Sequence, residues 1–559
     1  MTDQAPTDAS GETTPSDAES IHRLEQQRRE KRDRVRDELG FSPYGVVPYA
    51  GADGAPLELV SLAQAHALYD ADADARHQET ESAAKAFKKA NPDAPEGDVP
   101  GVVDERPRVS VAGRVVLHRD NGKLIWMNLR DDSREQFQIA VSKRDCDEGG
   151  FGLAKLTDLG DIVVASGPLM KTRAGEVTLW AGALRPASKA LAPPPEKHVG
   201  LTDHESRYRR RYVDMWSNPE VTRAIHLRGR VVQRVRSFLD ERGYLEVETP
   251  MLQTRAGGAA ARPFVTRMNA LDIDLYLRIA PELYLKRLLV GGLPRVFEIN
   301  RNFRNEGLDK QHNPEFTMLE LYHAHGNVET VMGVTEALVR DAARCAAEAR
   351  SQELGPTALE ALALPFGDVV VDYESPFARV AYAELFERAL GFAMTDFDRA
   401  LAEAPGRGVK TKNEEGVALD PWFVVNELFE AVAEPALDPG KPTFITHYPA
   451  VLSPLTRPNA EDPSLADRAD LFIAGMEIGP HYTELNDPEV QAQKFREQLA
   501  GVDDEESTFR TFDDEFIDAL KVGMPPAGGM GIGIDRLMML LVGSPTIRDV
   551  IAFPLMRPV

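Results

Sequence analysis

The sequence predicts an α+β protein: a small five-stranded β-barrel followed by a larger domain in which helices flank a central antiparallel sheet. Its 559 residues exceed what one hydrophobic core usually fills. Five short strands follow one another between residues 109 and 187, with a turn signal at Asn121-Gly122, as in a closed barrel of the OB-fold type. Residues 295–322 alternate apolar and polar side chains on both sides of a polar turn, which predicts a long antiparallel hairpin.

Composition limits the compartment and the class of partner. Cys146 and Cys345 lie far apart without disulfide or metal-ligand spacing, so neither a disulfide framework nor a zinc site is expected, and a reducing cytoplasm fits. No apolar run approaches the length of a membrane span, and the N-terminus has no signal-peptide pattern. The net charge of −24 opposes general binding to nucleic acid, although a basic patch acts locally, within a screening length of about 10 Å.

The first hundred residues divide into an acidic tail and a basic helix. Residues 1–19 are rich in Ser, Thr, Pro and Asp and nearly free of large apolar side chains, which predicts disorder. Residues 20–100 contain a helix that ends at Gly40, followed by a connecting segment. This helix is the most basic stretch of the chain because of Arg28, Arg29, Lys31, Arg32, Arg34 and Arg36. The helix is either an ion-paired surface helix or one that lies against nucleic acid, and the sequence leaves both open.

The barrel, residues 101–191, is a candidate nucleic-acid-binding domain. Barrels of this type bind single strands by stacking bases on aromatic side chains of the sheet. Trp126 and Phe137 are available for stacking and Gln138 for a base edge, although an aromatic residue in a small barrel more often belongs to its core. Residues 192–216 contain consecutive prolines and the basic run RYRRRY, and they predict a linker into the large domain.

Residues 217–559 form the predicted large domain. An amphipathic helix at 218–243 is followed by the strand LEVETP. Helical segments at about 333–440 interrupt the sheet as an inserted subdomain, and strands at 442–455 and 469–487 lead to a glycine-rich strand and a final helix. The chain has neither a GxGxxG sequence nor a Walker loop, so a doubly wound nucleotide-binding fold is not expected.

The hairpin places charges among apolar side chains. Arg304 and Glu320 lie inside otherwise apolar strand segments, where an unpaired charge is costly. We therefore expect both to serve an occupied polar site. Arginine is a planar fork that can hold two oxygens of a phosphate or a carboxylate, and Phe316 offers a face on which a base can stack.

Several segments carry a resemblance to a known family. FRNEGLDKQHNPEF (303–316) resembles motif 2 of the class II aminoacyl-tRNA synthetases, GMGIGIDRLMML (529–540) resembles motif 3, and ERGYLEVETPML (241–252), marked by Pro250, resembles motif 1. Within the class, TRAGGAAARPF, RIAPELYLKRL and PEFTMLELY resemble the bacterial lysyl-tRNA synthetases of class IIb. The resemblance runs from about Ile21 to the end of the chain. It implies an OB-fold anticodon-binding domain and a class II catalytic domain.

The resemblance implies a ligase that works in two steps. L-lysine and ATP would give lysyl-adenylate and pyrophosphate, and the lysyl group would then pass to the 3′-terminal ribose of tRNA(Lys). This chemistry needs positioning and charge cancellation rather than a protein nucleophile. Arg304, on the α-phosphate and the lysine carboxylate, and Arg536, on the γ-phosphate, would be the catalytic residues. The ATP-binding residues that the motifs imply are Arg304, Glu306, His312, Phe316 and Arg536.

The resemblance also implies a metal site. Asp470 and Glu477, seven positions apart on a predicted strand, would share Mg²⁺, up to about three ions per active site with ATP, because this ion prefers carboxylates and phosphate oxygens. Asp470 stands where the family usually has Glu, so its charge is kept while its reach is shorter.

The pocket for the amino acid is expected to be acidic, because a buried ε-ammonium needs anionic and hydrogen-bonding partners. Glu320, Tyr322 and Glu484 match the family's ε-amine contacts. Glu282 and the backbone of Gly258 match its α-amine contacts, and Tyr482 would pack along the lysine stem. Pro480 stands where the family usually has Asn. Either His481 compensates for that amide or this end of the pocket is built differently.

Two further interfaces follow from the resemblance. On the barrel, Trp126, Gln138 and Glu176 match the anticodon-reading positions, although the β-turn before Gln138 is one residue longer than the family's pattern. Motif 1, marked by Pro250, builds a dimer interface in the family, which implies a homodimer. No membrane partner is expected.

Three rival functions are weighed. A paralogue that lysylates a protein such as elongation factor P would lack the barrel at 109–187. A non-catalytic tRNA-binding module would be expected to lose Arg304 or Arg536, and both are present. Specificity for aspartate or asparagine would require a basic pocket rather than an acidic one.

Overall fold

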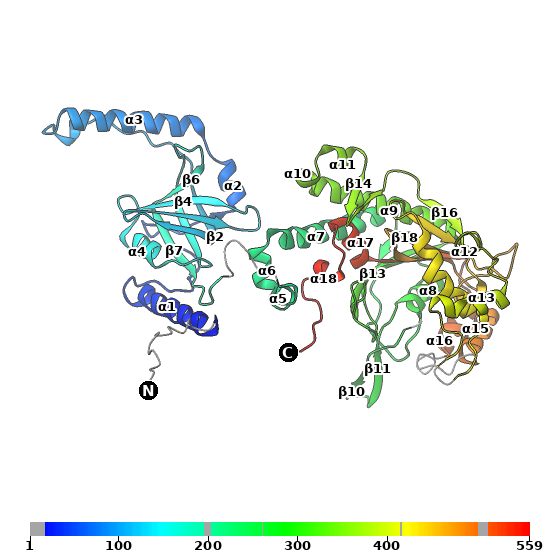
Figure 1. The fold of residues 1–559 in the computed structure, drawn as a ribbon. Helices are drawn as coiled ribbons and strands as arrows, with labels where there is room; N and C mark the ends of the chain where they lie inside the picture. The colour runs from blue at the N-terminus through cyan, green and yellow to red at the C-terminus, as the bar shows by residue number, and fades with distance from the viewer. Residues whose placement is uncertain (1–16, 195–202, 260, 414–415, 501–511, 559) are drawn as a thin grey trace, which may run out of the picture. The chain divides into compact units, whose positions relative to one another are not determined.

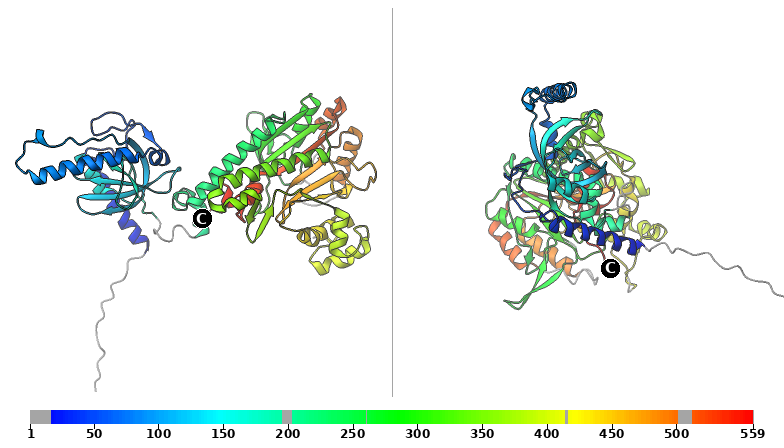
Figure 2. Two further views of the ribbon diagram at one scale, coloured as in Figure 1. Left: turned by 90° about the horizontal axis from the view of Figure 1, so that it is seen from above. Right: turned by 90° about the vertical axis from the view of Figure 1, so that its left-hand side faces the viewer.

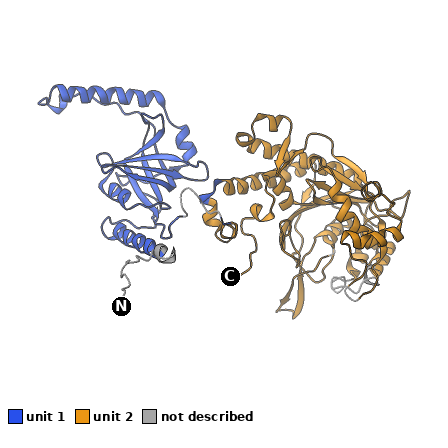
Figure 3. Ribbon diagram, in the orientation of Figure 1, with its two compact units in different colours: residues 1–203, 216–219 blue, residues 204–215, 220–559 orange. Residues whose placement is uncertain are grey.

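The protein is described by a computed structural model that covers residues 17–194, 203–259, 261–413, 416–500 and 512–558. It forms two compact units, residues 1–203 with 216–219 and residues 204–215 with 220–559 (Figure 3). Most of the predicted disordered tail therefore lies outside the described residues. A helix already begins at Asp17, slightly before the predicted boundary.

The first unit is a closed β-barrel (Figure 1). Its strands are β1 (Leu59–Val60), β2 (Arg108–Asp120), β3 (Leu124–Arg130), β4 (Phe137–Ser142), β5 (Ile162–Lys171), β6 (Val177–Ala181) and β7 (Ala183–Ser188). The order is β1-β2-β3-β4-β6-β5-β7, and the additional pairing of β2 with β5 closes the barrel. The structure confirms the predicted OB-fold barrel, with the fifth predicted strand divided at Gly182 into β6 and β7. Alternate residues of β3 are buried in the barrel core, which is the period-two pattern of the sequence.

Helices flank the barrel. They are α1 (Asp17–Asp37), α2 (Leu62–Ala67), α3 (Ala71–Ala90) and α4 (Glu148–Leu156), with a 3₁₀ turn η1 (Glu96–Asp98). The side chains of the basic run in α1, residues 28–36, are all engaged. Arg28 is buried and donates to the carbonyls of Leu159 and Ala190, 3.0 and 2.9 Å away, and Lys31 pairs with Asp158 at 2.6 Å. The other arginines of the basic run pair with carboxylates of their own segment. These contacts favour the ion-paired interpretation of α1.

The second unit is built on one eight-stranded sheet. In spatial order its strands are β16 (Ala378–Ala381), β17 (Thr443–Thr446), β18 (Arg468–Ile473), β19 (Met476–Thr483), β20 (Ala527–Gly533), β13 (Glu315–Ala324), β12 (Arg295–Phe303) and β8 (Leu245–Glu246). The central neighbours are antiparallel, and only the two edge pairs, β16–β17 and β12–β8, are parallel. The predicted hairpin is confirmed as β12–β13, in register from Arg295↔His323 to Phe303↔Glu315.

Both faces of the hairpin are covered, because neighbouring residues of a strand point to opposite faces. Phe297 and Leu321 enter a core shared with α7 (Pro219–Asp240), α9 (Val328–Ala349) and α17 (Ile534–Val542). Val296 and Tyr322 enter a second core with α8 (Glu282–Val290), α15 (Pro488–Ala500) and α16 (Asp514–Gly523). Buried on two sides, the central strands hold the side chains of a site in fixed positions.

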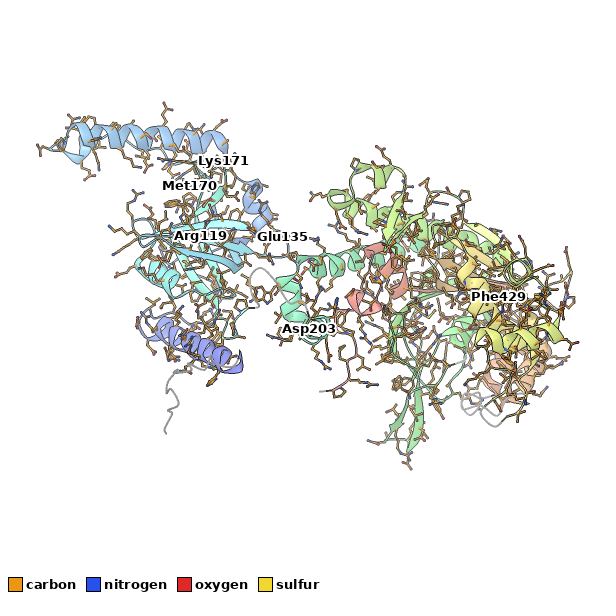
Figure 4. All side chains as sticks on the ribbon, in the orientation of Figure 1. Arg119, Glu135, Met170, Lys171, Asp203 and Phe429 are labelled. Atoms are coloured by element: carbon orange, nitrogen blue, oxygen red, sulfur yellow. The ribbon has the colours of Figure 1, made fainter. Side chains whose placement is uncertain are left out.

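The inserted subdomain begins later than the sequence suggests. The apolar stripe of α9 packs on the main sheet, so residues 333–349 belong to the catalytic-domain core. A separate core is formed by α12 (Tyr382–Leu390), α13 (Phe397–Glu403), α14 (Pro421–Leu428) and the helical turns η2 (Ala404–Arg407), η3 (Phe429–Ala433) and η4 (Glu434–Ala436). Its helices form a distinct lobe in Figure 2, and Figure 4 marks Phe429 within it. Phe429 is fully buried and stacks on Tyr382 with ring centroids 3.8 Å apart.

Smaller elements complete the second unit. They are α5 (His204–Arg209), α6 (Arg211–Ser217), β9 (Leu252–Gln253), β10 (Val265–Met268), β11 (Ile273–Leu277), α10 (Ser351–Leu354), α11 (Pro356–Glu360), β14 (Ala363–Phe366), β15 (Val369–Asp372), η5 (Ala450–Leu452) and α18 (Ile547–Val550). Within the described ranges, no helix is both long and apolar enough to cross a membrane.

The predicted linker contains structure. Residues 195–202 lie outside the described residues, but the RYRRRY run forms parts of α5 and α6. Arg211 is buried, pairs with Asp214 at 2.9 Å and donates to the carbonyl of Ile551. Arg207 also pairs with Asp214, at 2.8 Å. This basic run therefore has structural partners of its own.

Candidate active site

A cavity of about 850 Å³ opens over the central strands of the second unit. It is lined by β13, β18, β19 and β20, by the start of α8 and α17, by the loop between β12 and β13, and by residues of the inserted lobe. Of the residues predicted for ATP, lysine and metal, those that line it are Gly258, Glu282, Arg304, Glu306, His312, Phe316, Glu320, Tyr322, Asp470, Glu477, Tyr482 and Arg536. Glu484 is buried behind this lining and is 1% exposed.

Arg304 is a cation without a protein counterion. It follows β12, and its backbone N–H donates to the carbonyl of Pro314 at 2.9 Å, which fixes the base of the side chain. The guanidinium lies over the ring of Phe316, 5.1 Å from its centroid. It makes no hydrogen bond or ion pair with any residue that the structure describes. A partly buried, unpaired arginine fork in a cavity provides a binding site for a phosphate or carboxylate group.

A second cation is tied to the loop that follows Arg304. Arg536 lies in the first turn of α17 and donates to the carbonyl of Glu477 at 2.7 Å and to Nε2 of His312 at 2.9 Å. The other ring nitrogen of His312 bonds the carboxylate of Asp309 at 2.7 Å. This chain of contacts anchors the predicted ATP-binding loop beside the N-terminus of a helix, where partial positive charge also favours an anion. Glu306 lies in the same loop and is exposed.

Glu320 is a buried carboxyl group that faces the cavity without a partner. Directly across the ladder from it, Glu298 is held by Arg278 and by the hydroxyl of Thr249, each at 2.7 Å. Glu320 is 5% exposed and makes no hydrogen bond or ion pair with the described part of the chain. Burial raises the pKa of Glu320 to about 8, the nearby Glu282 adds to the rise, and Arg304 opposes it. A carboxyl group in this environment is stabilised by an incoming cation.

Because Gly529 has no side chain, it leaves space for the side chains that pack at this end of the cavity. It is paired with Tyr322 of β13 on one side and with Tyr482 of β19 on the other. A Cβ atom at this position would lie 1.9 Å from Oε1 of Glu484 and 2.6 Å from the ring of Tyr322. Such contacts do not occur between real atoms, so Glu484 and Tyr322 can approach each other only across a glycine. Sequence analysis placed Gly529 in motif 3 without assigning it this role.

The α-amine side of the predicted pocket also depends on a glycine. Gly258 has φ +89°. A Cβ atom added to it would lie 3.2 Å from the Cβ atom of Glu282 and 3.2 Å from the Cβ atom of Ala280. A residue with a side chain is strained at this φ. Only glycine therefore allows the backbone at position 258 to lie this close to Glu282. Glu282 begins α8 and is 8% exposed.

The predicted metal residues lie on two strands rather than one. Asp470 is on β18 and Glu477 on β19, joined by a tight turn at Ala474 and Gly475. Both line the cavity. Both carboxylate oxygens of Asp470 accept from Arg468, at 3.0 and 2.6 Å. Among the described residues, no group of three or more His, Cys, Asp or Glu side chains could hold a metal ion.

Two carboxylates that sequence analysis missed line the same end of the cavity. Glu430 and Glu434 come from η3 and η4 of the inserted lobe. Burial, together with the nearby Glu430, Glu477 and Asp470, raises the pKa of Glu434 to about 8. This excess of crowded carboxylates fits a divalent cation that arrives with nucleotide phosphates and takes only part of its ligands from the protein. Only the inserted lobe's fold brings these residues to the cavity, so spacing along the chain gave no signal.

His481 does not compensate for Pro480. Pro480 lines the cavity, whereas His481, the next residue of β19, points to the other face. There its ring nitrogens contact the hydroxyl of Thr335 at 2.8 Å and the carbonyl of Ala469 at 3.2 Å. Burial lowers the pKa of His481 to about 4, so it is neutral at pH 7. Of the two alternatives for the missing amide at Pro480, the one that remains is that this end of the pocket is built differently.

Comparisons with known proteins agree with this arrangement. Residues 203–557 match the family model for class II tRNA synthetases (D, K and N), and residues 109–187 match that for the OB-fold nucleic acid binding domain. The chain is 46% identical over 458 residues to the lysine–tRNA ligases of Cronobacter sakazakii and Escherichia coli, which covers 81% of this chain and 86% of each relative. The chain belongs to the lysine–tRNA ligase family.

In this lysine–tRNA ligase family member, the outer face of the barrel carries the predicted anticodon-reading residues. Trp126, Ala140 and Trp180 lie side by side on β3, β4 and β6. The two indole rings meet edge to face, with centroids 6.2 Å apart, and Nε1 of Trp180 donates to Asp145 at 2.9 Å. The small Ala140 leaves an aromatic corner between them. Sequence analysis missed Trp180, although an aromatic residue two positions after Thr178 in the predicted strand EVTLWAGAL was a usable signal.

The neighbouring row on that face is polar. Asn128, Gln138 and Thr178 are paired across the same three strands, and Oε1 of Gln138 accepts from the Thr178 hydroxyl at 2.9 Å. Glu176 is exposed in the turn between β5 and β6. Arg119, opposite Trp126 on β2, is exposed and labelled in Figure 4. Stacking surfaces, amide groups and a cation on one face suit an unpaired nucleotide.

Proposed function

We propose that the protein activates L-lysine with ATP and transfers it to the 3′-terminal ribose of tRNA(Lys). The observation that supports the proposal is that one cavity presents both a cation and a carboxyl group that lack partners of opposite charge. Within the described ranges, Arg304 is a cation without a counterion, and Glu320 is a buried carboxyl group without a partner. Lysine bound to ATP supplies both partners, since it presents a carboxylate beside a phosphate at one end and an ammonium group at the other.

In the first step the lysine carboxylate attacks the α-phosphorus of ATP and pyrophosphate leaves. Arg304 neutralises the charge that develops on the α-phosphoryl oxygens and keeps the carboxylate in line. Phe316 stacks on adenine, and Arg536 with His312 holds the terminal phosphates. In the second step the ribose hydroxyl attacks the lysyl carbonyl, the ester bond forms and AMP leaves.

Mg²⁺, held by Glu477 and Asp470 together with phosphate oxygens, would neutralise charge on the phosphates when it is bound. Asp470 is already paired with Arg468, so Glu477 is the better placed of the two for direct ligation. Glu430 and Glu434 add negative charge behind them and favour a divalent ion over a monovalent one.

On the amino-acid side, Glu320, Tyr322 and Glu484 serve the ε-ammonium, Glu282 and the Gly258 backbone serve the α-ammonium, and Tyr482 covers the stem. Pro480 lines the cavity where the family has an amide. Arg304 is then the polar group left to orient the lysine carboxylate, because His481 faces away.

The experiment that tests the proposal is amino-acid-dependent ATP–pyrophosphate exchange without tRNA, run with each of the twenty amino acids. We expect exchange with lysine alone. Exchange with a different amino acid would reassign the specificity to the Pro480 end of the pocket. A purified, folded protein that exchanges with none would overturn the proposed activity.

We expect lysine binding to release a proton near pH 7. In the empty pocket the raised pKa of Glu320, about 8, keeps this carboxyl group protonated below pH 8, and an ammonium ligand lowers that pKa again. Titration calorimetry at pH 7 in two buffers of different ionisation enthalpy measures the release, which should shrink as the pH rises through 8. Heats that do not depend on the buffer at pH 7 would contradict this.

We also propose that the barrel reads the anticodon through Trp126, Gln138 and Glu176, with Trp180 as a second stacking surface. Replacing Trp126 or Trp180 by alanine should weaken tRNA(Lys) binding by about 10- to 100-fold, because stacking is worth roughly 1–3 kcal/mol per base. Lysine-dependent exchange without tRNA should be unchanged in both variants, and this separates the barrel's role from that of the cavity. Unchanged tRNA binding in both variants would contradict the assignment.

A homodimer through motif 1 is the proposed assembly. Pro250 is exposed and is followed by Met251 and Leu252, which are 46% and 50% exposed. The hairpin β10–β11 extends from the same part of the unit (Figure 1). Its exposed apolar side chains, with the loop between the strands, are Val265, Met268, Leu271 and Ile273. An exposed apolar surface of this kind is typical of an oligomer interface.

A further inference from the structure

Lys286 is a buried cation that no part of the proposed mechanism uses. It lies on α8, one turn after Glu282, and is 0% exposed. Its Nζ atom is 2.6 Å from Oε1 of Glu282 and 2.5 Å from Oε2 of Glu484. The ring of Tyr322 lies 6.0 Å away. Lys286 therefore joins the carboxylate expected to face the α-ammonium to one expected to face the ε-ammonium.

A buried lysine ammonium between two carboxylates is unusual in a site that is expected to bind a cation. Burial alone lowers the pKa of Lys286, but Glu282 and Glu484 outweigh burial and raise it, so the side chain stays charged. Burial and the nearby Glu282 raise the pKa of Glu484, and Lys286 opposes that rise. Without the ammonium, two buried carboxylates would face each other, and one of them would take up a proton.

We propose that Lys286 is a positioning residue for the substrate lysine, whose ammonium group ties Glu282 to Glu484 and keeps both carboxylates aimed at the two amino groups of the substrate. This inference rests on the proposed function. A ligand cation then meets acceptors that are already oriented, and the order imposed by Lys286 is part of the lysine specificity. Glu484 can play this part from behind the cavity lining because Lys286 fixes it from the side of α8.

The groups that face this cluster come from several elements. Glu282 lies on α8 itself, Glu320 and Tyr322 on β13, and Tyr482 and Glu484 at the end of β19. Opposite them, β20 contributes Gly529, which has no charge. Lys286 is the one cation in direct contact with Glu484 among the described residues.

The test replaces Lys286 by methionine, which keeps the length and removes the charge. Steady-state exchange kinetics should show the KM for lysine raised by at least about 30-fold and the KM for ATP unchanged. In the wild type the KM for lysine should already fall between pH 6.5 and 8.5, because Glu320 loses a proton when lysine binds. In this variant it should fall more steeply and up to a higher pH, because Glu484 then also has to lose a proton before it binds. Lys286→Arg keeps the charge and should restore the wild-type pH profile.

A double-mutant cycle and a surface control sharpen the result. Because Lys286 acts in part through Glu484, Lys286→Met should weaken lysine binding less in the Glu484→Gln background than in the wild type, and the remaining loss reports its contact with Glu282. Lys521→Met on α16, where the side chain is 61% exposed and pairs with Asp518, should behave as the wild type. Should Lys286→Met fail to fold, Lys286→Gln takes its place in the same measurements.

The same measurements distinguish a wrong role for Lys286 from a wrong proposed function. A wild type that exchanges with lysine, combined with a Lys286→Met variant of unchanged lysine KM or unchanged pH profile, overturns the role of Lys286 alone. Equal losses for lysine and ATP would also overturn it, since they indicate general damage. A wild type that does not exchange with lysine overturns the proposed function instead.

Discussion

Replacing Arg304 by alanine should lower kcat/KM for lysine-dependent exchange by about 10³-fold or more. The guanidinium has no counterion among the residues that the structure describes. The variant therefore leaves developing phosphoryl charge without its stabilising donor, a loss worth about 10²–10³-fold for one such donor in enzymes. Arg304 would also orient the lysine carboxylate, which adds to the effect. Steady-state exchange at saturating and limiting lysine measures both contributions.

Arg301 offers a matched control for this variant. It lies on β12, three residues before Arg304, is half exposed and pairs with Glu315 at 3.7 Å, away from the cavity lining. Because exposed ion pairs contribute at most about 1 kcal/mol, Arg301→Ala should keep kcat/KM within a few-fold of the wild type. Arg304→Lys, which keeps the charge and loses the fork, should remain strongly impaired. An Arg304→Ala variant with near-normal exchange would refute the assigned role.

Replacing Gly529 by alanine should abolish productive lysine binding in a protein that still folds. The added methyl would lie 1.9 Å from Oε1 of Glu484 and 2.6 Å from the Tyr322 ring, so one of these side chains must leave its place. We expect the KM for lysine to rise by at least about 100-fold, comparable to the loss of a buried charged contact. The KM for ATP should change little, because the altered contacts lie at the amino-acid end.

Gly333 provides the control for adding a methyl group. It lies on α9 with no atom within 4 Å of an added Cβ, so Gly333→Ala should leave exchange unchanged and stabilise the helix slightly. Comparing the thermal unfolding of the two variants separates misfolding from a local clash. Normal lysine binding by Gly529→Ala would show that the packing around Glu484 is not required for specificity.

Much of the site could be predicted because its chemistry is concentrated in short segments. The hairpin containing Arg304 and Glu320 was recognisable by alternation broken by charges, and the structure confirms the antiparallel pairing of its two strands. The barrel was recognisable by short alternating strands, and its closure is confirmed. Local patterns of this kind survive folding because the side-chain period of a strand is fixed by backbone geometry.

Other features could not be predicted, because they depend on contacts between distant segments. Glu430 and Glu434 reach the cavity only through the fold of the inserted lobe. The face to which His481 points is set by the pleat of β19 between β18 and β20, and adjacent Pro480 takes the cavity side. The boundary of the inserted lobe differs from the predicted one for the same reason. The helix α9 packs on the main sheet and not in the lobe, and only tertiary packing determines this.

By itself, the sequence determined the fold class, the position of the barrel, the family and most of the charged residues that line the cavity, because motifs and side-chain periodicity are properties of short segments. The tertiary structure alone decided which charges are already paired. It paired Asp470 with Arg468, placed Lys286 between Glu282 and Glu484, and left Arg304 and Glu320 without partners. Charge pairing acts across a few ångströms of space, and those distances exist only after the chain has folded.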